Sequence, residues 1–290
     1  AIWGTIRLFK TESILFRSDD DGSSLKGIKK NKGAFFNPFN GLIYFSLALI
    51  LLYYLGSYWQ GQDLYRGLVN TQLFIIALPV LLIIRLLSLK PKQVLRLQAP
   101  KLLPTLLIPF MAIPATMLVA ILSQVINTIW PFPKEYLENL SRLFSQDVPL
   151  WQSFLVVAVA PGVCEELLFR GFFPRFFEKY GMKITIVLTA LLFAAFHLDP
   201  FRFVPVFLLG LLLGYITLKS GSIYLSMLSH AINNGLALFI TAFAAEPWIK
   251  VLISDADNLH YWVAAPALAV FLLALYLFNK ACGAKECVES

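Results

Sequence analysis

The chain has 290 residues, of which 58% are hydrophobic and 14% are charged. A soluble domain carries about 25% charged residues, so this composition excludes a soluble globular protein and predicts an integral membrane protein. The net charge of +7 does not require nucleic acid as a partner, because basic residues gather in the loops of membrane proteins. We therefore expect the lipid bilayer, and no nucleic acid, among the partners.

The first 40 residues differ from the rest of the chain because they are polar and of mixed charge. The stretch SDDDGSSLKGIKKNKG is typical of a flexible linker. We interpret 1–40 as a cytoplasmic linker or as the tail of a longer parent protein. The opening IRLFKTESILFR faintly resembles the end of an ABC-type export permease half. Fusion to, or association with, such a permease is therefore an open alternative.

Residues 41–280 form the predicted membrane domain, and 281–290 form a C-terminal tail. A helix needs about 20 apolar residues to cross a bilayer, which predicts an all-α polytopic protein with about eight transmembrane helices. The expected spans are 41–59, 71–89, 103–129, 151–177, 183–198, 202–219, 222–245 and 260–279. Between spans, 90–102 is expected at the membrane interface and 130–150 as an amphipathic cap. The three cysteines are too sparse for a disulfide framework.

The basic residues predict the topology of these spans. If the N-terminus is cytoplasmic, most of the 24 Lys and Arg residues fall in loops on the cytoplasmic side. This asymmetry favours cytoplasmic positions for both termini.

Three of the apolar segments carry polar groups that are costly in hydrocarbon. They read EELLFR at 165–170, FAAFH at 193–197 and HAINN at 230–234. Helical spacing puts Glu166 and Arg170 on one face as an i, i+4 pair and turns Glu165 away by about 100°. We interpret Glu166 with Arg170 as an ion pair that braces the helix. Glu165 then has no basic partner at its own spacing.

The third segment adds a second i, i+4 pair, His230 and Asn234, with Asn233 turned off their face and interpreted as structural. At about 1.5 Å per helical residue, the three polar segments reach similar depths near the middle of a ~30 Å core. Alone, His197 would be a helix–helix hydrogen-bonding group and Asn234 a packing residue. Together the groups could converge on one site.

A glutamate, two histidines and an asparagine away from bulk water suit hydrolysis. A carboxylate removed from water is a better base. It takes a proton from water as that water attacks a carbonyl group. An amide or imidazole N–H then donates to the developing oxyanion.

The three segments follow the patterns EExxxR, FxxxH and HxxxN, in that order. In this the sequence resembles the CPBP family, the CAAX prenyl protease type II and bacteriocin-processing group, over 150–245. The resemblance implies an eight-helix intramembrane endopeptidase of the glutamate type with no cofactor and no bound metal. It also implies cleavage of a membrane-embedded peptide or lipidated protein near its C-terminus, in a bacterial inner membrane. The roles that it implies are Glu165 as base, His197 as water ligand, His230 and Asn234 as oxyanion site, and Glu166 and Arg170 as supporting residues.

Three alternatives stay open at this point. The first is a metal-dependent protease with Glu165, His197 and His230 as ligands. The second is a non-enzymatic transport or peptide-immunity scaffold, in which the polar groups bind a peptide or carry protons. The third is a catalytically inactive scaffold of the same family.

Overall fold

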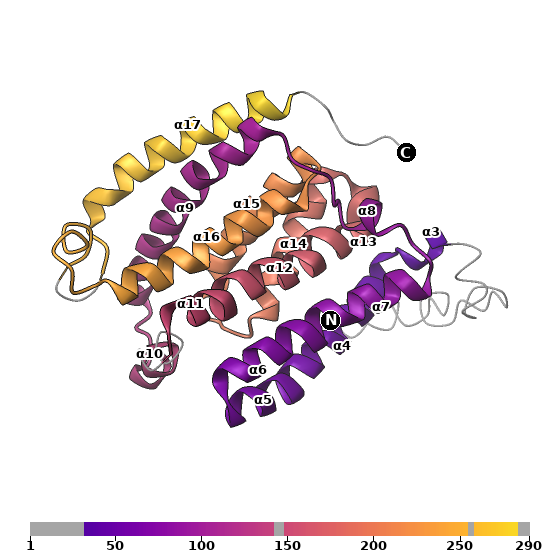
Figure 1. Ribbon diagram of the computed structural model, residues 1–290, viewed down its shortest axis with the longest axis horizontal. Coiled ribbons are helices and arrows are strands. Elements are labelled where there is room, and N and C mark those ends of the chain that lie inside the picture. Colours follow the sequence, from indigo (N-terminus) through magenta and orange to yellow (C-terminus); the bar gives the residue numbers. More distant parts are fainter. Residues whose placement is uncertain (1–31, 142–147, 255–257, 284–290) are drawn as a thin grey trace, which may run out of the picture.

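The computed structural model describes residues 32–141, 148–254 and 258–283, and these form helices and loops (Figure 1). The expected all-α, polytopic fold is confirmed. Seven helices in this part of the chain are long and apolar enough to cross a membrane. They are Pro38–Gln62, Leu64–Leu86, Leu102–Ile129, Leu150–Tyr180, Phe203–Ser220, Ile223–Ala242 and Tyr261–Cys282. The opening 1–31 and the tail 284–290 lie outside the described residues.

The eighth expected span, 183–198, is a helix that is shorter than the others. It is α14, Met182–Phe196, with 15 residues. At about 1.5 Å per residue it is roughly 22 Å long, less than the ~30 Å hydrocarbon core. The helix stops because Leu198 has a positive φ of 52° and Asp199 precedes a proline, which disfavours helical backbone.

Several long helices contain wide π turns that adjoin prolines. Three π segments end two residues before a proline: η3 (Thr71–Ala77), η5 (Phe154–Val159) and η6 (Leu167–Phe172). Proline has no N–H for the carbonyl four residues before it, and its ring crowds that carbonyl. A local π turn relieves the crowding, and such turns are frequent at functional sites. The segment α12 (Ala160–Glu166), which carries both glutamates, lies between η5 and η6.

The helices form two groups around the span that contains α12. On one side, α9 (Leu102–Ile129) packs along α17 (Ala264–Cys282), and α16 (Ile223–Ala242) packs against α9 and α12 (Figure 1). On the other side, the hairpin that contains η3 contacts α12. A phenylalanine-rich core packs the hairpin against the span that contains α12 and against α14, and its buried rings include Phe45, Phe169, Phe172, Phe173, Phe176, Phe193 and Phe196.

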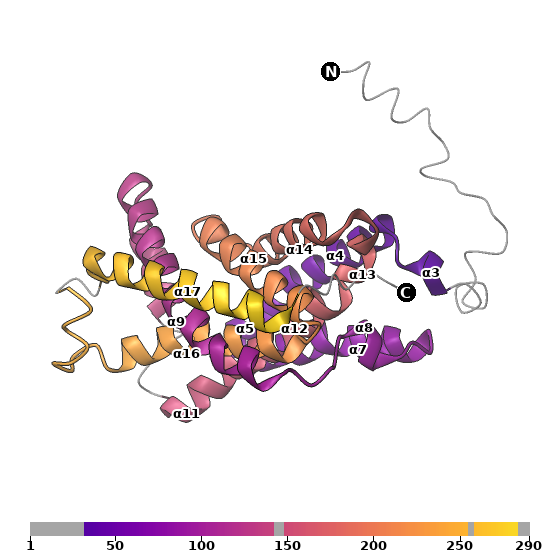
Figure 2. The ribbon, with the colours of Figure 1, turned by 90° about the horizontal axis from the view of Figure 1, so that it is seen from above.

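The loops expected on the cytoplasmic side meet at one end of the molecule. Both views place α3 (Lys32–Phe35), α8 (Pro91–Val94) and α13 (Pro174–Phe177) at this end (Figures 1 and 2). The segment that follows α8 accepts two hydrogen bonds from the start of α16. The Ile223 amide donates to the Arg96 carbonyl at 3.1 Å, and the Ser222 hydroxyl donates to the Gln98 carbonyl at 2.6 Å.

The opposite end is closed by α10 (Lys134–Ser141), within the region expected to form a cap. The Tyr136 hydroxyl donates to Asp199 at 2.7 Å, and its ring packs on Phe201 at 4.9 Å. Burial, together with the hydrogen bond to Asp199, raises the pKa of the Tyr136 phenol. The phenol, which is protonated at neutral pH even at its ordinary pKa of about 10, thus donates the hydrogen bond that links α10 to the turn after α14.

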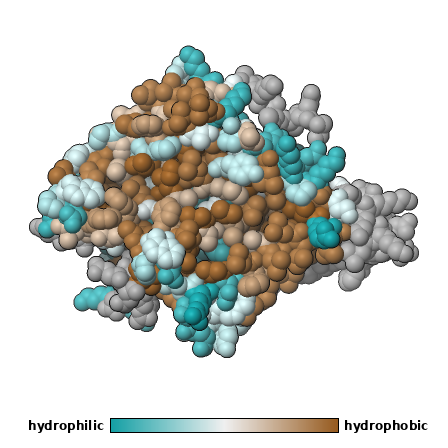
Figure 3. Space-filling model, in the orientation of Figure 1, coloured by the Kyte–Doolittle hydropathy of each residue, from teal (hydrophilic) through white to brown (hydrophobic). Residues whose placement is uncertain are grey.

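The outer surface is largely apolar, as contact with lipid requires. Hydrophobic residues cover most of the face in view and hydrophilic residues lie towards its edges (Figure 3). Large exposed side chains come from several spans, for example Leu47, Phe110 and Leu273. The protein is therefore an integral multi-pass membrane protein.

Candidate active site

The site is built where α12 meets α16. The two helices approach closely at Gly162, where an added Cβ would lie 3.1 Å from the Ala231 nitrogen. Small residues allow such contact between membrane helices. The close approach brings Glu165 and Glu166 next to His230, although 64 residues separate Glu166 from His230 in the sequence.

Glu166 and Arg170 form the i, i+4 contact that helical spacing indicates. Arg170 Nη1 lies 2.9 Å from Glu166 Oε1, and both side chains are buried. The guanidinium also donates to the Gly210 carbonyl at 3.3 Å and lies 4.1 Å from the centre of the Phe193 ring. Two buried charges are thus paired and hydrogen-bonded, as burial in a low-dielectric interior requires.

Glu166 has a second partner that local spacing does not indicate. His230 Nδ1 lies 2.9 Å from the same oxygen, Glu166 Oε1. A carboxylate oxygen accepts, so Nδ1 is the protonated nitrogen of the ring. This fixes the ring so that Nε2 lies 4.0 Å from Glu165 Oε2. The Glu166–Arg170 pair is therefore hydrogen-bonded to one catalytic candidate, His230, which lies next to a second, Glu165.

Glu165 points away from Arg170 to a different helix. Its Oε1 accepts a hydrogen bond from Gln72 Nε2 at 2.8 Å. Its Oε2 is buried and has no hydrogen-bond partner among the described residues. Gln72 was not among the expected site residues. The available signal was a glutamine inside an apolar span, the same signal that selected the other polar groups.

His197 ends α14 and bonds to its own helix. Its Nδ1 lies 2.8 Å from the Phe193 carbonyl, which can only accept, so Nδ1 carries the proton and Nε2 of the neutral ring is an acceptor. Phe193, the first residue of FxxxH, packs edge-on against His197 at 4.8 Å and against His230 at 5.8 Å. The same ring contacts Arg170, so one phenylalanine positions three groups of the site.

Asn234 bonds to α12's own span rather than to the glutamates. Its Nδ2 donates to the Val157 carbonyl at 3.0 Å, and its Oδ1 accepts from Asn233 at 3.0 Å. Pro161, four residues after Val157, has no N–H to offer that carbonyl. Asn233 in turn accepts from the Thr116 hydroxyl at 3.0 Å. Asn233, interpreted from sequence as structural, thus orients the Asn234 amide.

A protein-family comparison matches part of this chain. Residues 147–236 match the family of Rce1-like type II CAAX prenyl endopeptidases. Over these residues the chain is similar to that family. The expected family is thereby confirmed over a range that holds Glu165, His197, His230 and Asn234. No curated protein and no solved structure matches the chain.

The metal alternative requires at least three grouped ligands. In residues 32–141, 148–254 and 258–283, no three His, Cys, Asp or Glu side chains are grouped to hold a metal ion. Zinc ligands lie about 2.0–2.2 Å from the ion, and the 4.0 Å between Glu165 Oε2 and His230 Nε2 is wide for neighbouring ligands. Cys164 lies beside Glu165 as a free, buried thiol.

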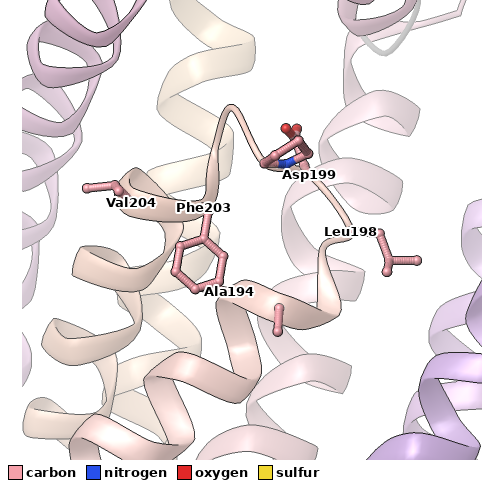
Figure 4. A pocket seen from close by; sticks show the side chains of 7 residues that line it. Ala194, Leu198, Asp199, Phe203 and Val204 are labelled. Carbon is pink, nitrogen blue, oxygen red and sulfur yellow. The ribbon is translucent and has the colours of Figure 1, made fainter. Parts of the chain in front are cut away.

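A cavity of about 390 Å³ lies beside the family's second motif, at the turn between α14 and α15 (Phe203–Ser220). Figure 4 shows Ala194 from α14, Leu198 and Asp199 from the turn, and Phe203 and Val204 from α15 around it. The lining is mainly apolar. His197 precedes the turn but does not line the cavity, so the cavity is separate from the glutamates.

Proposed function

We propose that the protein is an intramembrane endopeptidase in which Glu165 activates a water molecule. One observation carries this proposal: Glu165 is buried with Oε1 held by Gln72 and Oε2 without a partner among the described residues, 4.0 Å from His230 Nε2. A general base needs such an oxygen within reach of the proton that it takes.

The proposed reaction begins with proton transfer to Glu165. Glu165 Oε2 takes one proton of the water while the water oxygen bonds to the peptide carbonyl carbon. The carbonyl electron pair moves to the carbonyl oxygen. When the carbonyl re-forms, the C–N bond breaks and Glu165 returns the proton to the leaving nitrogen. His197 Nε2, an acceptor in the neutral ring, holds the second O–H of the water.

The oxyanion is assigned to His230 and Asn234. His230 Nδ1 already donates to Glu166, so Nε2 donates only when the ring carries a second proton. Asn234 has one N–H on the Val157 carbonyl and a second that remains for an oxyanion. Preorganised donors of this kind are often the largest single contribution to catalysis.

We assign the substrate to the class that the family name gives, a prenylated protein or peptide with a C-terminal CAAX sequence. A bilayer-embedded site suits a lipidated chain, because each buried CH₂ of the lipid contributes about 0.8 kcal/mol to membrane binding. The test uses protein in liposomes and two quenched fluorescent CAAX peptides, one farnesylated and one unmodified. Mass spectrometry of the products gives the cleaved bond. Equal turnover of both peptides would contradict the lipid requirement and leave the peptidase proposal standing.

Glu165→Gln tests the mechanism. The amide keeps the size of the side chain but cannot take a proton, so we expect turnover to fall about 10²–10⁴-fold. Cys164→Ala, at the adjacent buried position, is the control that keeps activity. Full activity in Glu165→Gln would contradict the assigned base, and full biological function without cleavage would favour the scaffold alternative.

We also propose that the reaction needs no bound metal. Exhaustive chelation should then leave turnover of the farnesylated peptide unchanged. Loss of activity on chelation, with recovery on addition of Zn²⁺, would support the metal alternative instead.

A further inference from the structure

Gln72 is a buried amide on a helix that carries none of the family's three motifs. It lies in η3, and 5% of its surface is exposed. A buried amide without partners is costly, so its hydrogen bonds decide whether the position is tolerated. Its Nε2 has one, to Glu165 Oε1 at 2.8 Å. Its Oε1 is buried without a partner among the described residues.

We propose that Gln72 is a positioning residue for the reaction, and this rests on the proposed function of Glu165. It holds Glu165 Oε1, so that Oε2 is the oxygen that faces His230 and takes the proton from water. An ionised carboxylate only accepts, and the hydrogen bond to Nε2 is therefore charge-assisted and strong. A proton on Oε1 would take the place of this bond, whereas a proton on Oε2 leaves Oε1 as a carbonyl oxygen that still accepts from Nε2. Gln72 thus selects the basic oxygen.

The residue before Gln72 makes its side-chain contacts within the hairpin and not with Glu165. The neighbouring Thr71 hydroxyl donates to the Gly67 carbonyl at 2.8 Å and accepts from Gln60 Nε2 at 3.2 Å. The segment η3 also packs against α12. Gln60 therefore serves as a control for Gln72 in the same hairpin. Each glutamine amide donates to a side chain, but Gln60 donates to Thr71 and Gln72 donates to Glu165.

The experiment replaces each amide by methionine, which keeps the length of the side chain and removes its hydrogen bonds. We expect Gln72→Met to lower kcat about 100-fold on the farnesylated peptide with KM little changed, as misplacement of a catalytic group does. Gln60→Met should keep kcat near the wild-type value. Protein is quantified by its folded fraction, so that lower stability alone does not register as lower kcat.

A double-mutant cycle on thermal stability tests the contact independently of activity. Gln72→Met, Glu165→Met and the double variant are melted in detergent, and the two single shifts in Tm should not add, because the residues share one hydrogen bond. Additive shifts would overturn the proposal. Wild-type kcat in Gln72→Met, with Glu165→Gln inactive, would also overturn it.

The cycle also separates this proposal from the function on which it rests. If the wild-type protein cleaves neither peptide, the proposed function fails while non-additive shifts still support the Gln72–Glu165 contact. If the wild type cleaves and Glu165→Gln does not, the proposed function stands and Gln72→Met alone decides the positioning role.

Discussion

One oxygen atom of Glu166 binds both Arg170 and His230. Oε1 accepts from Arg170 and from His230, each at 2.9 Å. Helical spacing predicts the contact with Arg170 but not the one with His230, because the i, i+4 rule describes contacts within one helix and His230 lies on another. The network predicts that stability and catalysis separate when both partners of the ion pair are removed.

Glu166→Gln alone should destabilise the fold by about 3–5 kcal/mol, because Arg170 is left as an unpaired buried charge. The double variant Glu166→Met with Arg170→Met removes both charges and should recover most of that loss. Turnover should stay low in the double variant, since His230 still lacks its acceptor. Unfolding in detergent and peptide cleavage measure the two effects, and wild-type turnover in the double variant would contradict the role given to Glu166.

At the scale of elements, prolines determine where backbone carbonyls accept from side chains. Pro161 leaves the Val157 carbonyl for Asn234, and Pro174 leaves the Arg170 carbonyl, which accepts from Arg96 at 3.3 Å. In each case the donor comes from a distant segment of the chain. The carbonyls that these prolines leave without an intrahelical donor thus bind side chains from other segments of the chain.

Pro161→Ala should show this at the active site. Alanine is better than proline in a helix interior by about 3 kcal/mol, so the fold should not lose stability. The new N–H competes with Asn234 for the Val157 carbonyl, and turnover should fall about tenfold as the amide loses its fixed orientation. Thermal melting and cleavage assays measure the outcome. Pro109→Ala, inside α9, is the control with unchanged turnover.

How much of the structure the sequence predicts depends on how far apart the contacting residues lie in the sequence. Spans follow from apolar runs, and most of their expected bounds differ from the helices by a few residues, because helix ends depend on caps and turns. The exception is the second span, expected from 71 and observed from Leu64. The Glu166–Arg170 contact follows from local spacing. The contacts of Gln72 with Glu165 and of Thr116 with Asn233 join residues 93 and 117 positions apart. No local pattern in one sequence encodes them.

At the scale of the whole molecule, the loops divide between two ends. The segment after α8 meets the start of α16 at one end, and α10 meets the turn after α14 at the other. This grouping is what the expected topology needs, with 90–101 and both termini on the cytoplasmic side.

Cysteine accessibility tests that topology. With the three native cysteines replaced, a cysteine at Lys92 should react with an impermeant maleimide only when the cytoplasmic face is open. A cysteine at Lys250 should react from the opposite face. The reverse pattern would invert the orientation and leave the fold unchanged.

The short helix α14 has a consequence for the bilayer itself. A hydrophobic segment of roughly 22 Å in a core of ~30 Å is mismatched, and lipid around a short segment thins to meet it. Thinning at α14 would adjoin the turn that follows His197, the residue assigned to hold water. A hydrolase in hydrocarbon consumes one water for each bond that it cuts. We therefore expect the mismatch at α14 to shorten the path by which that water arrives, so that the length of this helix affects the supply of a reactant.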